Sequence, residues 1–134
     1  NLLNREPEEE GILQDAQEQG SGFVAFSPLA QGLLTDRYLQ GIPSDSRVAR
    51  GGYLKKEALT PQLLHRIAAL NKVAARRGQT LAEMALAWLL KDNRVTSVIV
   101  GASSVEQLSD NLKALRNTSF TAEELSEIDR IIKG

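Results

Sequence analysis

SVIVGASSVEQLSDNLKAL, residues 97–115, is a short apolar run that ends in a turn of small residues and then enters a helix. The run is mostly β-branched, which predicts a short strand over residues 96–100. Ser104 and Gln107 have the spacing of a capping box, which predicts a helix start. Apolar residues then recur at helical spacing: Leu108, Leu112 and Leu115. The stretch therefore predicts a strand, a tight turn and a helix, in that order.

The turn contains no lysine, arginine, histidine or cysteine, yet it has the features of an anion site. A helix N-terminus carries unpaired N–H groups and about half a positive charge. Gly101 allows close backbone approach, and Ser103 and Ser104 add hydroxyl groups. At the end of a parallel strand, such a turn can bind an anion, and the anion found there most often is phosphate. Gln107 and Asn111 project toward the same side and could reach sugar or base atoms. The alternative is a structural cap without a ligand.

A second stretch, FSPLAQGLL at residues 26–34, closes another predicted strand with a Pro/Gly turn. The ends of the two strands are expected on the same face of the sheet, where barrels bind their ligands. Phe26 could stack on a planar ring or belong to the core. The irregular stretch 29–59 is long enough to be functional or mobile. Within it, Arg37 and Arg47 are either solvated or part of a loop that closes over a phosphate.

Hydrophobic periodicity and turn residues predict the order of helices and strands along the whole chain. The predicted elements are a helix from Pro7 to a stop at Gly20, a buried strand at 23–26, the long loop, a helix from Thr60-Pro61 to Gly78, a helix with a buried stripe of Leu81, Met84, Ala85, Trp88 and Leu89, the strand at 96–100, and helices that begin at Ser104 and Thr121. Strands separated by helices pair in parallel through right-handed crossovers. Two strands alone do not make a stable parallel sheet, so we expect the end of a larger α/β protein.

Composition narrows the functional classes. The chain has 134 residues, 42% apolar and 25% charged, with a formal net charge of −1, which suits one globular domain with a core. Scattered basic residues argue against a nucleic-acid surface, and no apolar run is long enough to cross a membrane. The absence of cysteine favours a cytoplasmic location. Because Asn1 opens the chain and Met84 is its only methionine, we expect a processed chain or a piece of a longer one. The single histidine, His65, is expected on the surface or in packing.

FSPLAQGLL followed about seventy residues later by VIVGASSVEQLSDN resembles the last part of the aldo-keto reductases. The likeness covers essentially the whole chain and is strongest to the branch of bacterial glyceraldehyde-3-phosphate reductases and potassium-channel β subunits. It implies that residues 1–134 are a single partial domain, the C-terminal part of a (β/α)8 TIM barrel that contains strands 7 and 8 with their helices.

The resemblance also implies that NADP(H) binds in an extended conformation across the C-terminal face of the barrel. It places Phe26 near the nicotinamide; Ser27, Leu29, Ala30 and Gln31 beside the pyrophosphate; Arg37 and Arg47 in the loop over the phosphates; Gly101 and Ser103 at the adenosine 2′-phosphate; and Gln107, Asp110 and Asn111 around the ribose and adenine. Many members of the family have a basic residue in the turn before the eighth helix, and this chain has none, so Arg47 would supply that charge.

The implied activity is reduction of a small-molecule aldehyde, such as glyceraldehyde 3-phosphate or a methylglyoxal-like compound, to an alcohol by hydride transfer. The family's catalytic tetrad of Asp, Tyr, Lys and His has no match in residues 1–134, so no catalytic residue is assigned and it stays open whether the chain alone is an enzyme. Two alternatives remain: a non-catalytic nucleotide-binding or regulatory module, and an inactive truncated fragment. Exposed edges of an incomplete barrel would favour a homo-oligomer.

Overall fold

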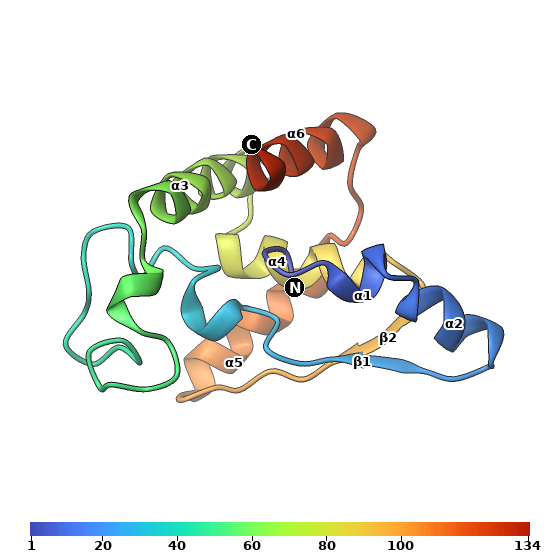
Figure 1. The fold of residues 1–134 in the computed structure, drawn as a ribbon, viewed down its shortest axis with the longest axis horizontal. Coiled ribbons are helices and arrows are strands. Elements are labelled where there is room, and N and C mark those ends of the chain that lie inside the picture. Colours follow the sequence, from blue (N-terminus) through green and yellow to red (C-terminus); the bar gives the residue numbers. More distant parts are fainter.

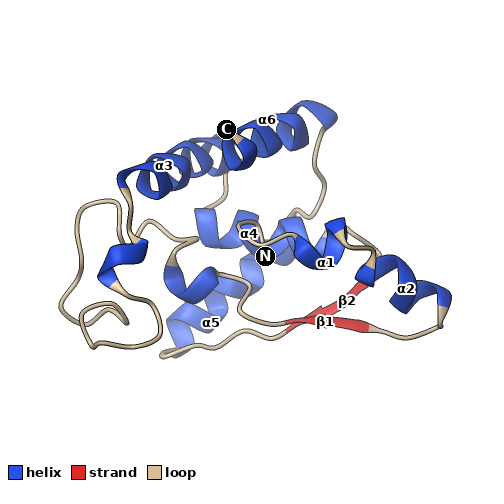
Figure 2. Cartoon of the chain, viewed as in Figure 1, coloured by secondary structure: helices blue, strands red, loops and turns tan.

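A computed structural model describes the chain from residue 1 to residue 134, and most of its ordered elements are helices (Figure 2). In chain order they are α1 (Glu6–Glu9), α2 (Ile12–Glu18), β1 (Phe23–Ala25), η1 (Ala30–Gly32), η2 (Lys56–Ala58), α3 (Pro61–Arg76), α4 (Leu81–Leu90), β2 (Val95–Val98), α5 (Val105–Leu112), η3 (Lys113–Arg116) and α6 (Ala122–Lys133). The η elements are short 3-10 segments, and η1 and η2 are the only helical elements in the long loop.

Hydroxyl side chains start the four long helices. Thr60, Thr80, Ser104 and Thr121 each accept a hydrogen bond from the backbone N–H three residues on. This satisfies one of the unpaired N–H groups at the helix start. Only Thr121 completes the reciprocal capping box, with the Glu124 side chain accepting from the Thr121 N–H. The capping box expected at Ser104 is therefore only half formed, because the Gln107 side chain binds Ser103 instead.

Two predicted boundaries are wrong. The helix expected from Pro7 to Gly20 is two short helices, because Gly11 adopts a left-handed conformation with φ of +82° and ends the first one. The strand expected at 96–100 is β2, Val95–Val98. Smaller differences are that the strand expected at 23–26 ends at Ala25 and that Leu115 lies in η3 rather than in α5. Helices α3, α4 and α6 lie where the periodicity predicts them.

The elements form layers on one face of a two-stranded parallel sheet. In Figure 1, α3 and α6 lie side by side as the outer layer, and α4 lies between them and the strands. The predicted stripe on α4 is buried, and Ile128 of α6 is fully buried with it. The opposite face of the sheet is open, since Val24 is 49% and Ile99 60% exposed. The expectation of a fully buried strand is therefore wrong for β1 in this chain.

A second apolar surface lies on α5 and η3. Its side chains are spaced three and four residues apart and are mostly exposed: Val105, Leu108, Leu112 and Leu115. A stripe with this spacing is typical of a helix face that packs against another element. None of the helices is both long and apolar enough to cross a membrane.

Replacing Ile128 with alanine is expected to lower the free energy of unfolding by about 2–5 kcal/mol, because it opens a cavity at the meeting point of α6 and the core. The loss is large for a chain in which 25 of 134 residues are buried. Urea denaturation followed by circular dichroism measures it. The matched control is Ile12→Ala on α2, where the side chain is 44% exposed. Equal losses for the two variants would contradict the assigned core.

Candidate functional site

The parallel sheet brings the two predicted site turns to one end of the molecule. Val24 lies opposite Ser97 and Ala25 opposite Val98, and the Ile99 N–H donates to the Ala25 carbonyl at 2.8 Å. Both strands therefore end at the same edge. In Figure 1 the long loop and the start of α5 lie toward that end. The sequence-based expectation of two strand ends on one face is confirmed.

The first turn, residues 26–31, has a strained backbone. Ser27, Ala30 and Gln31 have φ values of 49°, 48° and 60°, a region that non-glycine residues rarely adopt. The Ser27 carbonyl accepts from the Ala30 N–H and from the Asn1 side-chain amide, each at 3.0 Å, which holds the turn in place. Left-handed residues cluster at ligand sites, because strain is retained where it shapes a binding surface. Each of these three residues is a predicted pyrophosphate-side residue.

Phe26, immediately before this turn, is 76% exposed. The alternative that places Phe26 in the core is therefore wrong. Its ring is available to stack on a planar group. Leu29, the remaining predicted residue of this turn, is half-buried and packs against the core, as Ala30 does. These two residues contribute their backbone rather than a free side chain to the turn.

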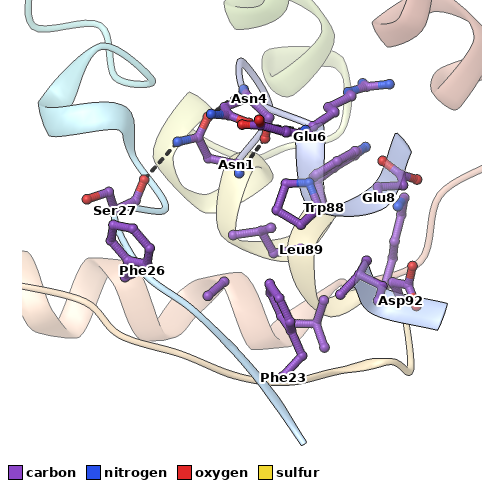
Figure 3. A pocket seen from close by; sticks show the side chains of 16 residues that line it. Asn1, Asn4, Glu6, Glu8, Phe23, Phe26, Ser27, Trp88, Leu89 and Asp92 are labelled. Carbon is purple, nitrogen blue, oxygen red and sulfur yellow. Dashed lines mark hydrogen bonds between the residues drawn. The ribbon is translucent and has the colours of Figure 1, made fainter. Parts of the chain in front are cut away.

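A cavity of about 380 Å³ is lined by residues of the N-terminal segment, of β1 and of α4, and by Phe26 and Ser27 (Figure 3). Its lining includes Trp88, whose ring centroid lies 4.7 Å from the Arg5 guanidinium carbon and 4.2 Å from the Lys91 ammonium nitrogen. Burial lowers the pKa of Lys91. Of the predicted site residues only Phe26 and Ser27 line this cavity. The sequence carried no signal for it, because its walls come from three distant segments.

The long loop is anchored by buried side chains rather than free to move as a whole. The anchors are Leu33, Leu34, Tyr38, Ser46, Val48 and Leu54. The Arg37 guanidinium pairs with the Asp45 carboxylate at 2.8 Å, and this interaction lowers the pKa of Asp45. Arg47 is exposed and makes no ion pair. The two predicted arginines of the loop thus differ: Arg37 has an acidic partner and Arg47 has none.

The second turn, residues 101–104, presents donors at the start of α5. The backbone N–H groups of Val105 and Glu106 have no acceptor within the chain. A side chain added at Gly101 would meet nothing within 4 Å, so the space beside the turn is open. These features fit an anion with several oxygens. The turn itself carries no charge.

Gln107, Asp110 and Asn111 are arranged differently from the expectation. The Gln107 side-chain oxygen accepts from the Ser103 N–H at 2.6 Å and from the Ser103 hydroxyl at 3.0 Å, so it closes the turn. Asp110 pairs with Lys113 at 2.6 Å. Asn111 is buried, and its amide nitrogen has no hydrogen-bond partner. The Gln107 side-chain nitrogen also has no acceptor within the chain, and unlike the Asn111 nitrogen it is not fully buried.

Other candidate groups do not gather into a second site. His65 is exposed on α3. Tyr38 is buried in the core, whereas Tyr53 is 96% exposed. No three histidine, aspartate or glutamate side chains lie close enough to hold a metal ion.

Comparison with known proteins places the chain in a family. The model of the Aldo/keto reductase family matches residues 1–133. An L-glyceraldehyde 3-phosphate reductase of Escherichia coli O157:H7 is 53% identical over 98% of this chain and 39% of its own length. A protein of Oryza sativa subsp. japonica described as a probable voltage-gated potassium channel subunit beta is 35% identical over 99% of this chain and 42% of its own length.

A solved structure gives the same result for the fold. A thermostable aldo-keto reductase crystallised with the inhibitor epalrestat superposes with a TM-score of 0.65 at 27% identity, covering 98% of this chain and 37% of that one. The expected family likeness and the α/β fold class are thus confirmed. The chain spans about two fifths of the length of the curated relatives it matches.

Replacing Ala30 with glycine is expected to raise the free energy of unfolding by about 0.5–1 kcal/mol. Relief of the left-handed strain, about 1–2 kcal/mol, exceeds the entropic cost of glycine, about 0.5–1 kcal/mol. Thermal unfolding of the variant measures the change. The control, Ala68→Gly inside α3, should instead destabilise by about 1 kcal/mol. Loss of stability in both variants would show that the turn is not strained.

Proposed function

The chain belongs to the aldo-keto reductase family, and on that premise we propose that it is the NADP(H)-binding portion of an enzyme that reduces aldehydes to alcohols. The observation that carries the proposal is the pair of turns at adjacent strand ends. One is the strained turn beside the exposed Phe26 ring, and the other is the start of α5 with its free N–H groups. A dinucleotide has a planar ring that can stack on Phe26 and phosphates that can accept from the N–H groups of α5. One such molecule could therefore contact both turns.

The residues present fit such a cofactor. Phe26 would stack near the nicotinamide, and the backbone of residues 27–31 would lie along the pyrophosphate. Val105 and Glu106 would donate their N–H groups to a phosphate oxygen, with the Ser103 side chain beside them. The free side-chain nitrogen of Gln107 would meet the adenine end, since the Asn111 amide is buried. When bound, the cofactor supplies the hydride that reduces the aldehyde carbon.

Positive charge to bind the phosphates would come from the long loop, residues 29–59. Because residues 101–104 contain no basic side chain, Arg47 is the residue expected to distinguish NADPH from NADH. An arginine presents paired N–H donors that match a phosphate. Its exposure and lack of an acidic partner leave Arg47 free for this contact.

The reacting groups that donate a proton and orient the carbonyl have no match in residues 1–134. We propose that they lie elsewhere in the complete enzyme and that this chain binds and orients the cofactor. The open face of the sheet and the apolar stripe on α5 support that division, since a closed barrel covers both. By the name of its 53% identical relative, glyceraldehyde 3-phosphate is the first substrate to test.

A regulatory module is the second candidate function. It rests on the 35% identity to the potassium channel subunit beta over nearly the whole chain. Under this reading the nucleotide would bind without turnover. Nucleotide binding together with no aldehyde reduction by the complete protein would favour it.

The proposal predicts saturable binding of NADPH, tighter than that of NADH, by isothermal titration calorimetry of the chain. Arg47→Ala should weaken NADPH binding about tenfold and NADH binding little, since a charge-assisted hydrogen bond contributes about 1.5–3 kcal/mol when buried and less when exposed. Ser103→Ala should weaken NADPH binding about two- to fivefold, because it removes one neutral hydrogen-bonding group.

The matched controls are Arg130→Ala and Ser126→Ala on α6, which remove the same groups from exposed positions in the outer layer. They should bind as the unmodified chain does. A folded chain that binds neither nucleotide would contradict the proposal, as would an Arg47 variant with unchanged preference.

A further inference from the structure

The Arg37–Asp45 ion pair closes one segment of the long loop. The two charged groups are 2.8 Å apart, and their side chains are 39% and 68% exposed. Seven residues, 38–44, lie between them. The pair therefore sits on the outside of the loop, where a dissolved ligand can reach both partners.

Both partners are held from the inside by buried neighbours. Tyr38, next to Arg37, is 2% exposed, and Ser46, next to Asp45, is 1% exposed. The Ser46 hydroxyl accepts from the Ala49 N–H at 3.2 Å. The ion pair is therefore presented by a fixed frame, and its positions do not depend on a disordered tip.

A hydrogen-bond chain connects Arg37 to the strained turn. The Arg37 N–H donates to the Thr35 hydroxyl oxygen at 3.2 Å, and that hydroxyl donates to the Gly32 carbonyl at 2.6 Å. Gly32 ends the η1 turn that includes Ala30 and Gln31. Arg37 thus belongs to the same unit as the proposed pyrophosphate surface.

The Asp45 carboxylate lies in a basic environment. Its pKa is lowered first by the hydrogen bond from Arg37, then by the charge of Arg37 and, more weakly, by that of Arg50. The loop, residues 29–59, carries five lysines and arginines against three acids. A carboxylate bound to the Arg37 guanidinium occupies the position that a phosphate oxygen would take.

We propose that Asp45 is an internal competitor for the nucleotide: it holds Arg37 in the free protein and is displaced when a phosphate of the dinucleotide takes its place. This inference rests on the proposed function and adds a residue that limits the affinity of the site. Exchange of one anion for another at Arg37 needs no change in the buried frame. Because exposed ion pairs are weak, Asp45 lowers the affinity for the dinucleotide only modestly.

The test compares Asp45→Asn with Asp36→Asn by calorimetric titration with NADPH. Asp36 is exposed in the same loop and makes no ion pair, so its variant measures the general effect of removing a negative charge. Asp45→Asn should bind NADPH about two- to fivefold more tightly than the Asp36 variant. In an Arg37→Ala background, the advantage of Asp45→Asn over Asp36→Asn should disappear.

Thermal unfolding separates competition from a purely structural role. Asp45→Asn is expected to bind more tightly while unfolding at the same or a slightly lower temperature, whereas a merely structural pair would lose affinity together with stability. Equal affinity of the Asp45 and Asp36 variants would overturn the inference alone. Failure of the unmodified chain to bind NADPH would overturn the proposed function and this inference with it.

Discussion

The parallel pairing of β1 with β2 is the constraint on which the site depends. It sets Ala25 opposite Val98 and lets the Ile99 N–H bond to the Ala25 carbonyl, so both strands end at one edge. The chain between them must cross over through helices, and α4 does so with a buried stripe against the strands. A turn that follows either strand is thereby delivered to the same end of the molecule.

The two turns then offer different chemistry. The turn after β1 is strained and held by hydrogen bonds to the Ser27 carbonyl, and it presents backbone together with one exposed aromatic ring. The turn after β2 presents N–H groups at a helix start, with Gln107 fixing the Ser103 hydroxyl beside them. Neither turn contains a charge, so positive charge has to come from the loop, where Arg37 is paired and Arg47 is not. We infer a site in which shape comes from the turns and charge from the loop.

Features that depend on local rules were predictable from the sequence. Thr60, Thr80 and Thr121 start helices where a hydroxyl precedes an apolar periodic run, and the α4 stripe is buried as its spacing requires. Other features depend on neighbours that a sequence does not name. From the sequence pattern, Gly11 is predicted to continue a helix, Phe26 to end a buried strand, and Gln107 to complete a capping box. The Arg37–Asp45 pair and the cavity beside Trp88 require the path of the chain in space.

The central claim is that the two turns form one dinucleotide site, and amide chemical-shift mapping tests it most directly. The ¹⁵N-labelled chain would be titrated with NADPH while its backbone amide resonances are followed. The account predicts that residues 27–34 and 101–106 shift together, along a single binding curve. Shifts confined to the residues around Trp88, or two turns that respond with different affinities, would contradict it.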